Sequence, residues 1–168
     1  MPGLFRGPSL MATAALAAAV FGLSACNSGP VTQLTSPPTT DSSLTLTIQH
    51  TPDGSILATG GGATLYDFVP DTPTHSACLN DGCVFQWPPL IKDGPIRLGP
   101  GVDPSLVGTL RRPDGSTQIS YGGHPLYTYN LDVTPGMVTG QAIDQDGGPW
   151  YVLTPKGNEI HTSFTING

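Results

Sequence analysis

The sequence predicts an all-β domain made of two tandem copies of one small antiparallel β-meander. The stretch from Pro52 to Asp71 recurs 61 residues later, without a gap, as Pro113 to Asp132, with identical residues at 9 of 20 positions. Self-similarity at a fixed spacing is typical of a duplicated structural unit. With 22 Gly and 18 Pro among its 168 residues, the chain is rich in turns and disfavours helices. We therefore expect one domain over residues 44–168, with repeat 1 at about 44–100 and repeat 2 at about 101–168.

Apolar and polar residues alternate with a period of two in several segments, as in strands with one buried face. A Pro-Asp-Gly turn opens each copy, and paired or tripled glycines then reverse the chain between two strands. Asp103 followed by Pro104 predicts one short helical turn over residues 103–107. The expected strands cover residues 44–49, 55–59, 65–69, 117–121, 126–131 and 160–166.

The first residues predict an export signal and a lipid anchor. Residues 1–25 carry Arg6 and then an Ala-rich apolar run too short to span a membrane, as in a signal peptide. Leu23-Ser24-Ala25-Cys26 resembles the bacterial lipobox, whose cysteine receives a diacylglyceryl group; the alternative is an ordinary secretory signal with a cysteine there by chance. Acyl chains on Cys26 would hold the protein at the extracytoplasmic face of the cell membrane. Residues 26–43 would then form a lipidated cysteine and a disordered Ser/Thr/Pro tether, either a plain linker or a site of O-linked sugar.

Charge and cysteine content limit the function further. The net charge of −6 argues against a basic surface that binds nucleic acid. Cys78 and Cys83 are close in an exported chain, so we expect them to form a disulfide bond. Four residues separate them, which differs from the redox motif C-x-x-C and makes a structural role the favoured interpretation over a redox or metal role.

An aromatic motif ends in aspartate in both copies. The motif residues are Tyr66, Phe68 and Asp71 in the first copy and Tyr127, Tyr129 and Asp132 in the second. Each aspartate is expected to accept a hydrogen bond from the backbone N–H two residues on, an Asx-turn, with a cation-binding or catalytic role as the alternative. Trp87 and Trp150 follow the two motifs at similar spacings. We expect both to anchor the core, the alternative being a platform on which a ligand stacks.

Taken together, these motifs resemble the bacterial secreted-repeat lipoproteins with a tandem Tyr-x-(Phe/Trp/Tyr)-x-x-Asp motif. The resemblance covers nearly all of the chain after the tether. It implies an envelope lipoprotein whose function is largely unknown, and it supplies no catalytic residues. The residues that carry it are the two motifs, Ser76-Ala77-Cys78, Cys83, Trp87-Pro88-Pro89-Leu90, Val102-Asp103 and Gly147-Gly148-Pro149-Trp150-Tyr151-Val152.

A search for catalytic and cofactor motifs finds none that is complete. Asp144-Gln145-Asp146 begins like a calcium loop, but Pro155 stands where a bidentate Glu is needed. His124, beside the Gly-Gly reversal, is expected to be a surface residue, with haem ligation as the alternative. We therefore expect no metal and no cofactor.

Three functions follow from these observations. The favoured one is a non-enzymatic binding or envelope-associated module whose partner is an unknown envelope protein or ligand. The alternative is an accessory of extracytoplasmic redox chemistry that binds haem or transfers electrons. A hydrolase has the least support, because the sequence contains no hydrolase motif.

Overall fold

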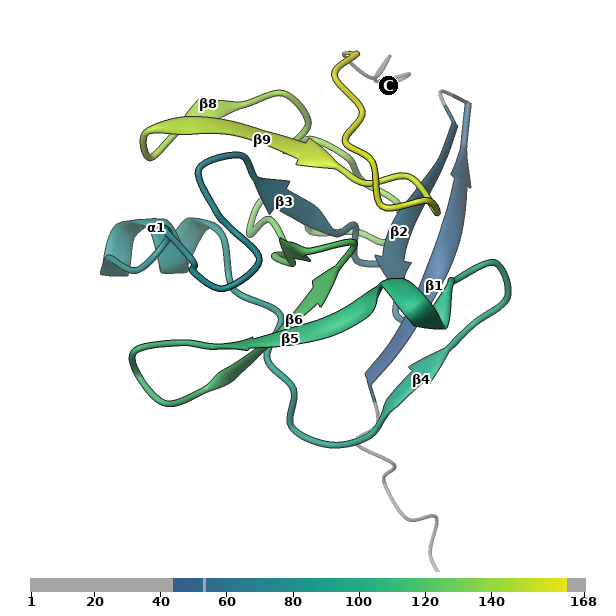
Figure 1. Cartoon of the computed structure of the whole chain (residues 1–168). Helices are drawn as coiled ribbons and strands as arrows, with labels where there is room; N and C mark the ends of the chain where they lie inside the picture. Colours follow the sequence, from purple (N-terminus) through teal and green to yellow (C-terminus); the bar gives the residue numbers. More distant parts are fainter. Residues whose placement is uncertain (1–43, 53, 163–168) are drawn as a thin grey trace, which may run out of the picture. The chain divides into compact units, whose positions relative to one another are not determined.

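A computed structural model describes residues 44–52 and 54–162, all within one compact unit that spans Thr40–Gly168. The predicted signal peptide, the lipidation site at Cys26, the tether and residues 163–166 of the predicted last strand lie outside the described residues. The described part contains three small sheets of three strands each and one short α-helix (Figure 1). The predicted all-β class is confirmed. None of the described helices has the length and apolar content needed to cross a membrane.

The first sheet has the strand order β2-β1-β4. Strand β1 (Leu44–Thr51) pairs antiparallel with β2 (Gly54–Thr59) and parallel with the short β4 (Ile96–Leu98). The alternation seen in the sequence places Leu46 fully inside the domain. The first two predicted strands are therefore confirmed.

The second sheet belongs to the second copy and has the order β5-β6-β7. The 3-10 helix η1 (Pro104–Leu106) precedes it, and the Asp103 carboxylate caps η1 by accepting a hydrogen bond from the Ser105 N–H at 2.8 Å. This confirms the predicted helical turn. The sheet consists of β5 (Val107–Arg111), β6 (Thr117–Tyr121) and β7 (His124–Pro125), which are joined antiparallel.

The third sheet combines segments of both copies. Strand β3 (Tyr66–Phe68) of the first copy pairs antiparallel with β9 (Gly148–Val152) of the second, and β8 (Asp144–Gln145) lies on the other side of β9. Figure 1 shows the blue β3 beside the yellow-green β9, although residues 69–147 separate them in the chain. Neither copy therefore completes this sheet alone.

The predicted strand over residues 126–131 is wrong. Only Tyr127 makes strand-like pairs there, as isolated bridges to Tyr66 and to Pro89. Beyond it the chain bends, because the Asn130 N–H bonds to the carbonyl of Gln86 and the Asp132 N–H bonds back to Tyr129.

The described end of the predicted last strand, residues 160–162, is not a strand either. Its link to the sheet is a bridge between Leu153 and Glu159 and one hydrogen bond from the Ile160 N–H to Val152.

The helix α1 (Asp81–Gln86) begins inside the loop closed by Cys78 and Cys83, extends past Cys83, and was not expected from the sequence. Its N-cap is Asn80, whose side chain accepts a hydrogen bond from the Cys83 N–H at 2.9 Å, and Asp81 adds a negative charge to the first turn. The cap was readable in the sequence, but six residues are too few to show an apolar helical period.

The core of the domain is a stack of aromatic rings. Trp87 and Trp150 lie parallel with ring centroids 4.0 Å apart, Phe68 stacks on Trp150 at 4.2 Å, and Tyr129 lies 4.2 Å from Trp87. All four side chains are buried, so the tryptophans anchor the core as expected. A Cβ on Gly140 would come within 2.9 Å of the Trp87 ring, which explains a glycine there.

A second, mainly aliphatic cluster contains Leu46, Leu57, Leu65, Leu90, Val102, Ile119, Tyr121, Leu126 and Leu153.

Cys78 and Cys83 are bonded as predicted, with their Cα atoms 5.6 Å apart, and both are buried. We expect the double substitution Cys78→Ala and Cys83→Ala to lower the free energy of unfolding by about 2 kcal/mol, because it frees the unfolded chain from a short covalent loop. Chemical denaturation of both proteins measures the difference. Alkylation of the denatured, unreduced wild type serves as a control and should label neither cysteine; two labelled thiols would contradict the bond.

Candidate functional site

The two motif tyrosines meet at the centre of the duplication. Tyr66 and Tyr127 occupy equivalent positions in the two copies, and each backbone N–H donates to the carbonyl of the other at 2.9 Å. This reciprocal pair joins the first copy to the second at a point where both main chains are buried. The repeat motif therefore lies at the contact between the copies.

The hydroxyl groups of these tyrosines also cross between the copies. Tyr66 donates to Oδ2 of Asp132 at 2.6 Å, and Tyr127 donates to Oδ2 of Asp71 at 2.6 Å. Burial, and then the neighbouring carboxylate, raise the pKa of both tyrosines. Both hydroxyls therefore stay protonated and act as donors. Each motif tyrosine bonds to the aspartate of the other copy.

The expected Asx-turns are wrong. The second residue after Asp71 is Pro73, which has no N–H to donate, and Oδ1 of Asp71 instead accepts from the Ala77 N–H at 2.7 Å. In the second copy Oδ1 of Asp132 accepts from the Thr139 N–H at 2.9 Å. Each carboxylate thus closes a loop of six or seven residues and binds the opposite tyrosine. Burial raises the pKa of Asp71.

A buried arginine extends the network around Tyr127. Arg112 donates to the Ser76 hydroxyl at 2.9 Å, to Gln118 at 2.6 Å and to the Cys78 carbonyl at 2.8 Å. The Ser76 hydroxyl lies 2.6 Å from that of Tyr127. The guanidinium group therefore donates to buried acceptors and, through Ser76, is linked to the hydrogen bond between Tyr127 and Asp71.

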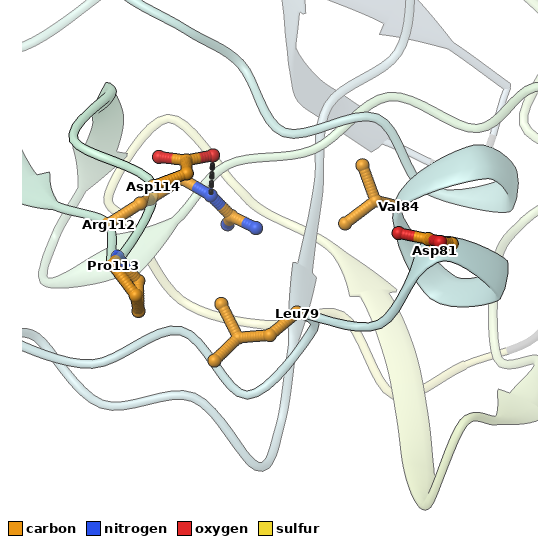
Figure 2. A pocket seen from close by; sticks show the side chains of 6 residues that line it. All are labelled: Leu79, Asp81, Val84, Arg112, Pro113 and Asp114. Carbon is orange, nitrogen blue, oxygen red and sulfur yellow. Dashed lines mark ion pairs between the residues drawn. The ribbon is translucent and has the colours of Figure 1, made fainter.

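A pocket of about 310 Å³ opens beside this arginine (Figure 2). Its lining is apolar at Leu79 and Val84, and Asp114 lies 3.9 Å from Nε of Arg112. Figure 2 shows the guanidinium extending from the Asp114 side of the pocket toward Val84. The charged groups of this pocket are the carboxylates of Asp81 and Asp114 and the guanidinium of Arg112, which already donates hydrogen bonds within the protein. These groups do not form a recognisable catalytic set. Its lining residues are Leu79, Asp81, Val84, Arg112, Pro113 and Asp114.

A second group of polar side chains lies where the three chain segments β3, β7 and the turn after β9 meet. Asp67 comes from β3, His124 from β7, and Glu159 from the segment bridged to Leu153. Nδ1 of His124 lies 3.3 Å from Oδ2 of Asp67 and 3.9 Å from Oε1 of Glu159. One ligand atom from each of the three residues lies within 4.8 Å of the others. We call these three residues the Asp67 cluster.

The Asp67 carboxylate is unusual because it is buried without a hydrogen bond. Only 1% of its side chain is exposed, and neither oxygen has a hydrogen-bond partner among the described residues. Its contact with His124 has the distance of an ion pair without the geometry of a hydrogen bond. Burial raises the pKa of Asp67 to about 6, and contact with Asp67 raises the pKa of His124.

The Asp67 cluster is open to solvent on one side. The side chain of His124 is 32% exposed and that of Glu159 is 20% exposed. At the rim, Nε2 of His161 lies 3.1 Å from Oε2 of Glu159, and the His161 ring packs edge-on against Tyr151. Solvent therefore reaches His124 and Glu159, which cover the buried carboxylate of Asp67.

The two copies differ at this cluster. In the gapless alignment of the repeats, Thr128 is equivalent to Asp67 and Ala63 is equivalent to His124. Thr128 shows that the repeated fold does not require a carboxylate at this position. Sequence analysis considered His124 only as a surface residue or a haem ligand and did not single out Asp67 or Glu159. The difference between the copies was the available signal.

The fold and these contacts define a class of protein: a duplicated β domain whose copies exchange tyrosine–aspartate hydrogen bonds. The chain belongs to the lipoprotein family described as a secreted repeat of unknown function, whose model matches residues 47–91 and 108–154. The matched segments correspond to the two copies, and membership of a secreted family implies a location outside the cytoplasm. No curated protein and no solved structure matches the chain.

The crossed hydrogen bonds can be tested by a double-mutant cycle. We expect Tyr66→Phe and Asp132→Ala to be coupled by about 1.5 to 3 kcal/mol in unfolding free energy, because the bond has a charged acceptor. The matched control pairs Tyr66→Phe with Asp71→Ala, two positions in one copy, and should show a coupling near zero. Chemical denaturation of all variants gives both values. Stronger coupling within the copy would overturn the crossed arrangement.

The Asp67 cluster predicts a stability that falls as pH rises. The folded protein holds protons on Asp67 and His124 more tightly than the unfolded chain does. The stabilisation is complete below about pH 4 for Asp67 and is lost as pH rises through its folded pKa of about 6. The contribution of His124 is complete below about pH 6.5 and is lost above that.

Between pH 4 and pH 7.5, we expect the unfolding free energy of wild type to fall by on the order of 2 to 3 kcal/mol more than that of Asp67→Asn. Urea denaturation in a chelating buffer at several pH values measures this change. Groups that do not contact Asp67 cancel in the comparison, whereas the contribution of His124, whose raised pKa depends on Asp67, is lost with the carboxylate. Parallel pH profiles for the two proteins would show that Asp67 titrates as it does in the unfolded chain.

Proposed function

We propose that the protein is a non-enzymatic binding module, anchored by lipid on Cys26 to the extracytoplasmic face of the cell membrane. Membership of a secreted lipoprotein family supports this location, and the lipobox at residues 23–26 supports the site of the anchor. Acyl chains on one cysteine would hold the folded domain near the membrane by burying methylene groups in the bilayer. The proposed partner is a small ligand or an envelope protein.

The observation that carries the binding role is the buried carboxylate of Asp67, which has no hydrogen-bond partner among the described residues and lies beside the partly exposed His124 and Glu159. A buried charge is costly unless it is paired, so this group favours a ligand that supplies the missing partner. The repeat motif leaves no comparable vacancy, because both oxygens of Asp71 and of Asp132 accept hydrogen bonds. The module therefore has a place for a ligand at one side of the domain.

The environment of the reactive groups supports binding in preference to catalysis. A histidine that serves as a catalytic base normally contacts the nucleophile it activates, whereas the ion pairs of His124 are with two carboxylates. Cys78 and Cys83 are tied up in the disulfide bond. The hydroxyls of Tyr66 and Tyr127 are kept protonated by their raised pKa and are bonded to aspartates. Among the described residues, these groups are poor nucleophiles.

The stack of aromatic rings is the observation that bears on the redox alternative. Phe68, Trp150, Trp87 and Tyr129 form a continuous series of contacts. All four rings are buried, and close packing of large apolar rings is sufficient to explain them. We therefore favour ligand binding over electron transfer.

The anchor is tested by Cys26→Ser in the full chain expressed in a bacterial host. We expect wild type to partition into the detergent phase and the variant to remain unprocessed or to leave the membrane fraction, because serine cannot accept the lipid. The double substitution Cys78→Ser and Cys83→Ser is the matched control and should keep wild-type partitioning. Membrane association of Cys26→Ser equal to wild type would refute the anchor, and turnover of a hydrolase substrate panel would refute the non-enzymatic role.

A further inference from the structure

We propose that Asp67, His124 and Glu159 bind a divalent transition-metal ion of the zinc class. This inference rests on the proposed binding function and names its ligand. It starts from three side chains whose donor atoms converge from separate segments of the fold. These donors are one imidazole nitrogen and carboxylate oxygens from two residues.

The distances between the donor atoms fit a small ion. A tetrahedral ion with ligands at about 2.0 to 2.2 Å holds its ligand atoms about 3.3 to 3.6 Å apart. Nδ1 of His124 lies 3.3 Å from Oδ2 of Asp67 and 3.9 Å from Oε1 of Glu159. The oxygens of Asp67 and Glu159 complete the set, since all three donor atoms lie within 4.8 Å of one another. The pair of His124 and Asp67 is therefore already at a coordinating distance, and binding an ion requires the partly exposed side chain of Glu159 to move inward.

Asp67 supplies an observation independent of the clustering. Its carboxylate is 99% buried and faces His124, yet neither oxygen has a hydrogen-bond partner among the described residues. The fold thus holds a buried carboxylate without a hydrogen-bond donor directly beneath two partly exposed side chains that can also bind a cation. A bound cation would coordinate one of these oxygens and neutralise the buried charge.

The donor types distinguish between classes of metal ion. Calcium takes six to eight oxygen ligands, and magnesium requires octahedral oxygen coordination. A site with one imidazole and two carboxylates suits zinc and neighbouring transition metals instead. Three protein ligands leave a fourth position that water can fill, and His161 contacts the outer oxygen of Glu159, with Nε2 3.1 Å from Oε2.

The duplication argues that this cluster serves something other than folding. The second copy has Thr128 where the first has Asp67, and the first copy has Ala63 where the second has His124. The repeated unit therefore folds with neutral side chains at both positions. We expect the metal-free domain to be folded and the ion to add stability by binding to it.

The test uses the full chain after treatment with a chelator. We expect Zn²⁺ to bind with a stoichiometry of one in isothermal titration calorimetry and to raise the melting temperature, whereas Ca²⁺ and Mg²⁺ at the same concentration should do neither. Asp67→Asn, His124→Gln and Glu159→Gln should each weaken Zn²⁺ binding at least tenfold. The last two lie at partly exposed positions, so they test the site even if Asp67→Asn is poorly folded.

Two matched controls come from outside the cluster. His50→Gln replaces a histidine that bonds to Ser55, and Asp144→Asn replaces an exposed carboxylate in β8; both should keep wild-type affinity. Co²⁺ provides a spectroscopic measurement, because a low-coordinate site with nitrogen and oxygen ligands gives intense visible absorption. This absorption should appear in wild type and in Asp144→Asn and be absent from His124→Gln.

Failure of Zn²⁺ to bind the wild type, or binding equal to wild type in all three cluster variants, would overturn the metal site. Binding that is lost in His50→Gln and kept in His124→Gln would assign the ion to a surface histidine and would also overturn it. None of these outcomes changes the partitioning of Cys26→Ser, so failure of the metal site is distinguishable from failure of the proposed anchored module. Hydrolysis by the zinc-loaded protein would refute the non-enzymatic role and keep the site.

Discussion

The reciprocal contact between Tyr66 and Tyr127 is the constraint on which the rest of the domain depends. Two backbone hydrogen bonds join the tyrosines to each other, and two hydroxyl bonds join each tyrosine to the aspartate of the other copy. The same contact sets β3 beside β9 and brings Trp87 against Trp150 at the centre of the core. One copy alone would leave these groups unpaired and these rings exposed to water, so the fold requires both copies.

Because the motif is used to join the copies, its presence says little about ligand chemistry. The aspartates of the motif accept hydrogen bonds with both oxygens, and their tyrosine partners are fixed as donors. Chemistry particular to this chain is therefore expected where the two copies differ. Asp67, next to Tyr66 in β3, is such a position, because its carboxylate has no counterpart in the second copy, where Thr128 is equivalent.

Asp67 and Asp71 are both shielded from solvent, but only Asp67 lacks hydrogen-bond donors, so burial of a carboxylate does not by itself identify a binding site. Asp71 receives hydrogen bonds from the Ala77 N–H and from Tyr127, so its charge is compensated within the fold. Asp67 faces His124, whose charge depends on a proton, and a second carboxylate, Glu159, whose negative charge raises the pKa of Asp67 further. Proteins commonly retain such destabilising groups at functional positions, where stability is lost in exchange for activity or binding. The cost at Asp67 is consistent with a binding role.

Local features were readable in the sequence because they depend on neighbouring residues. Alternation predicted β1, the Pro-Asp-Gly turn predicted that β2 follows it, the Asp103-Pro104 pair predicted η1, and the short spacing of Cys78 and Cys83 predicted their bond. The strand over residues 126–131 was mispredicted because Tyr127 pairs with two segments while the residues after it bond to Gln86 and turn.

The tertiary structure decided what depends on contacts between the copies. The sequence placed Tyr66 and Asp71 in one motif, but only the folded chain shows that each tyrosine bonds to the aspartate of the other copy. Likewise Asp67, His124 and Glu159 are far apart in the chain and belong to different segments. They converge because β3 pairs with segments of the second copy. The sequence by itself determined the repeat and its local elements, and the pairing between repeats determined the site.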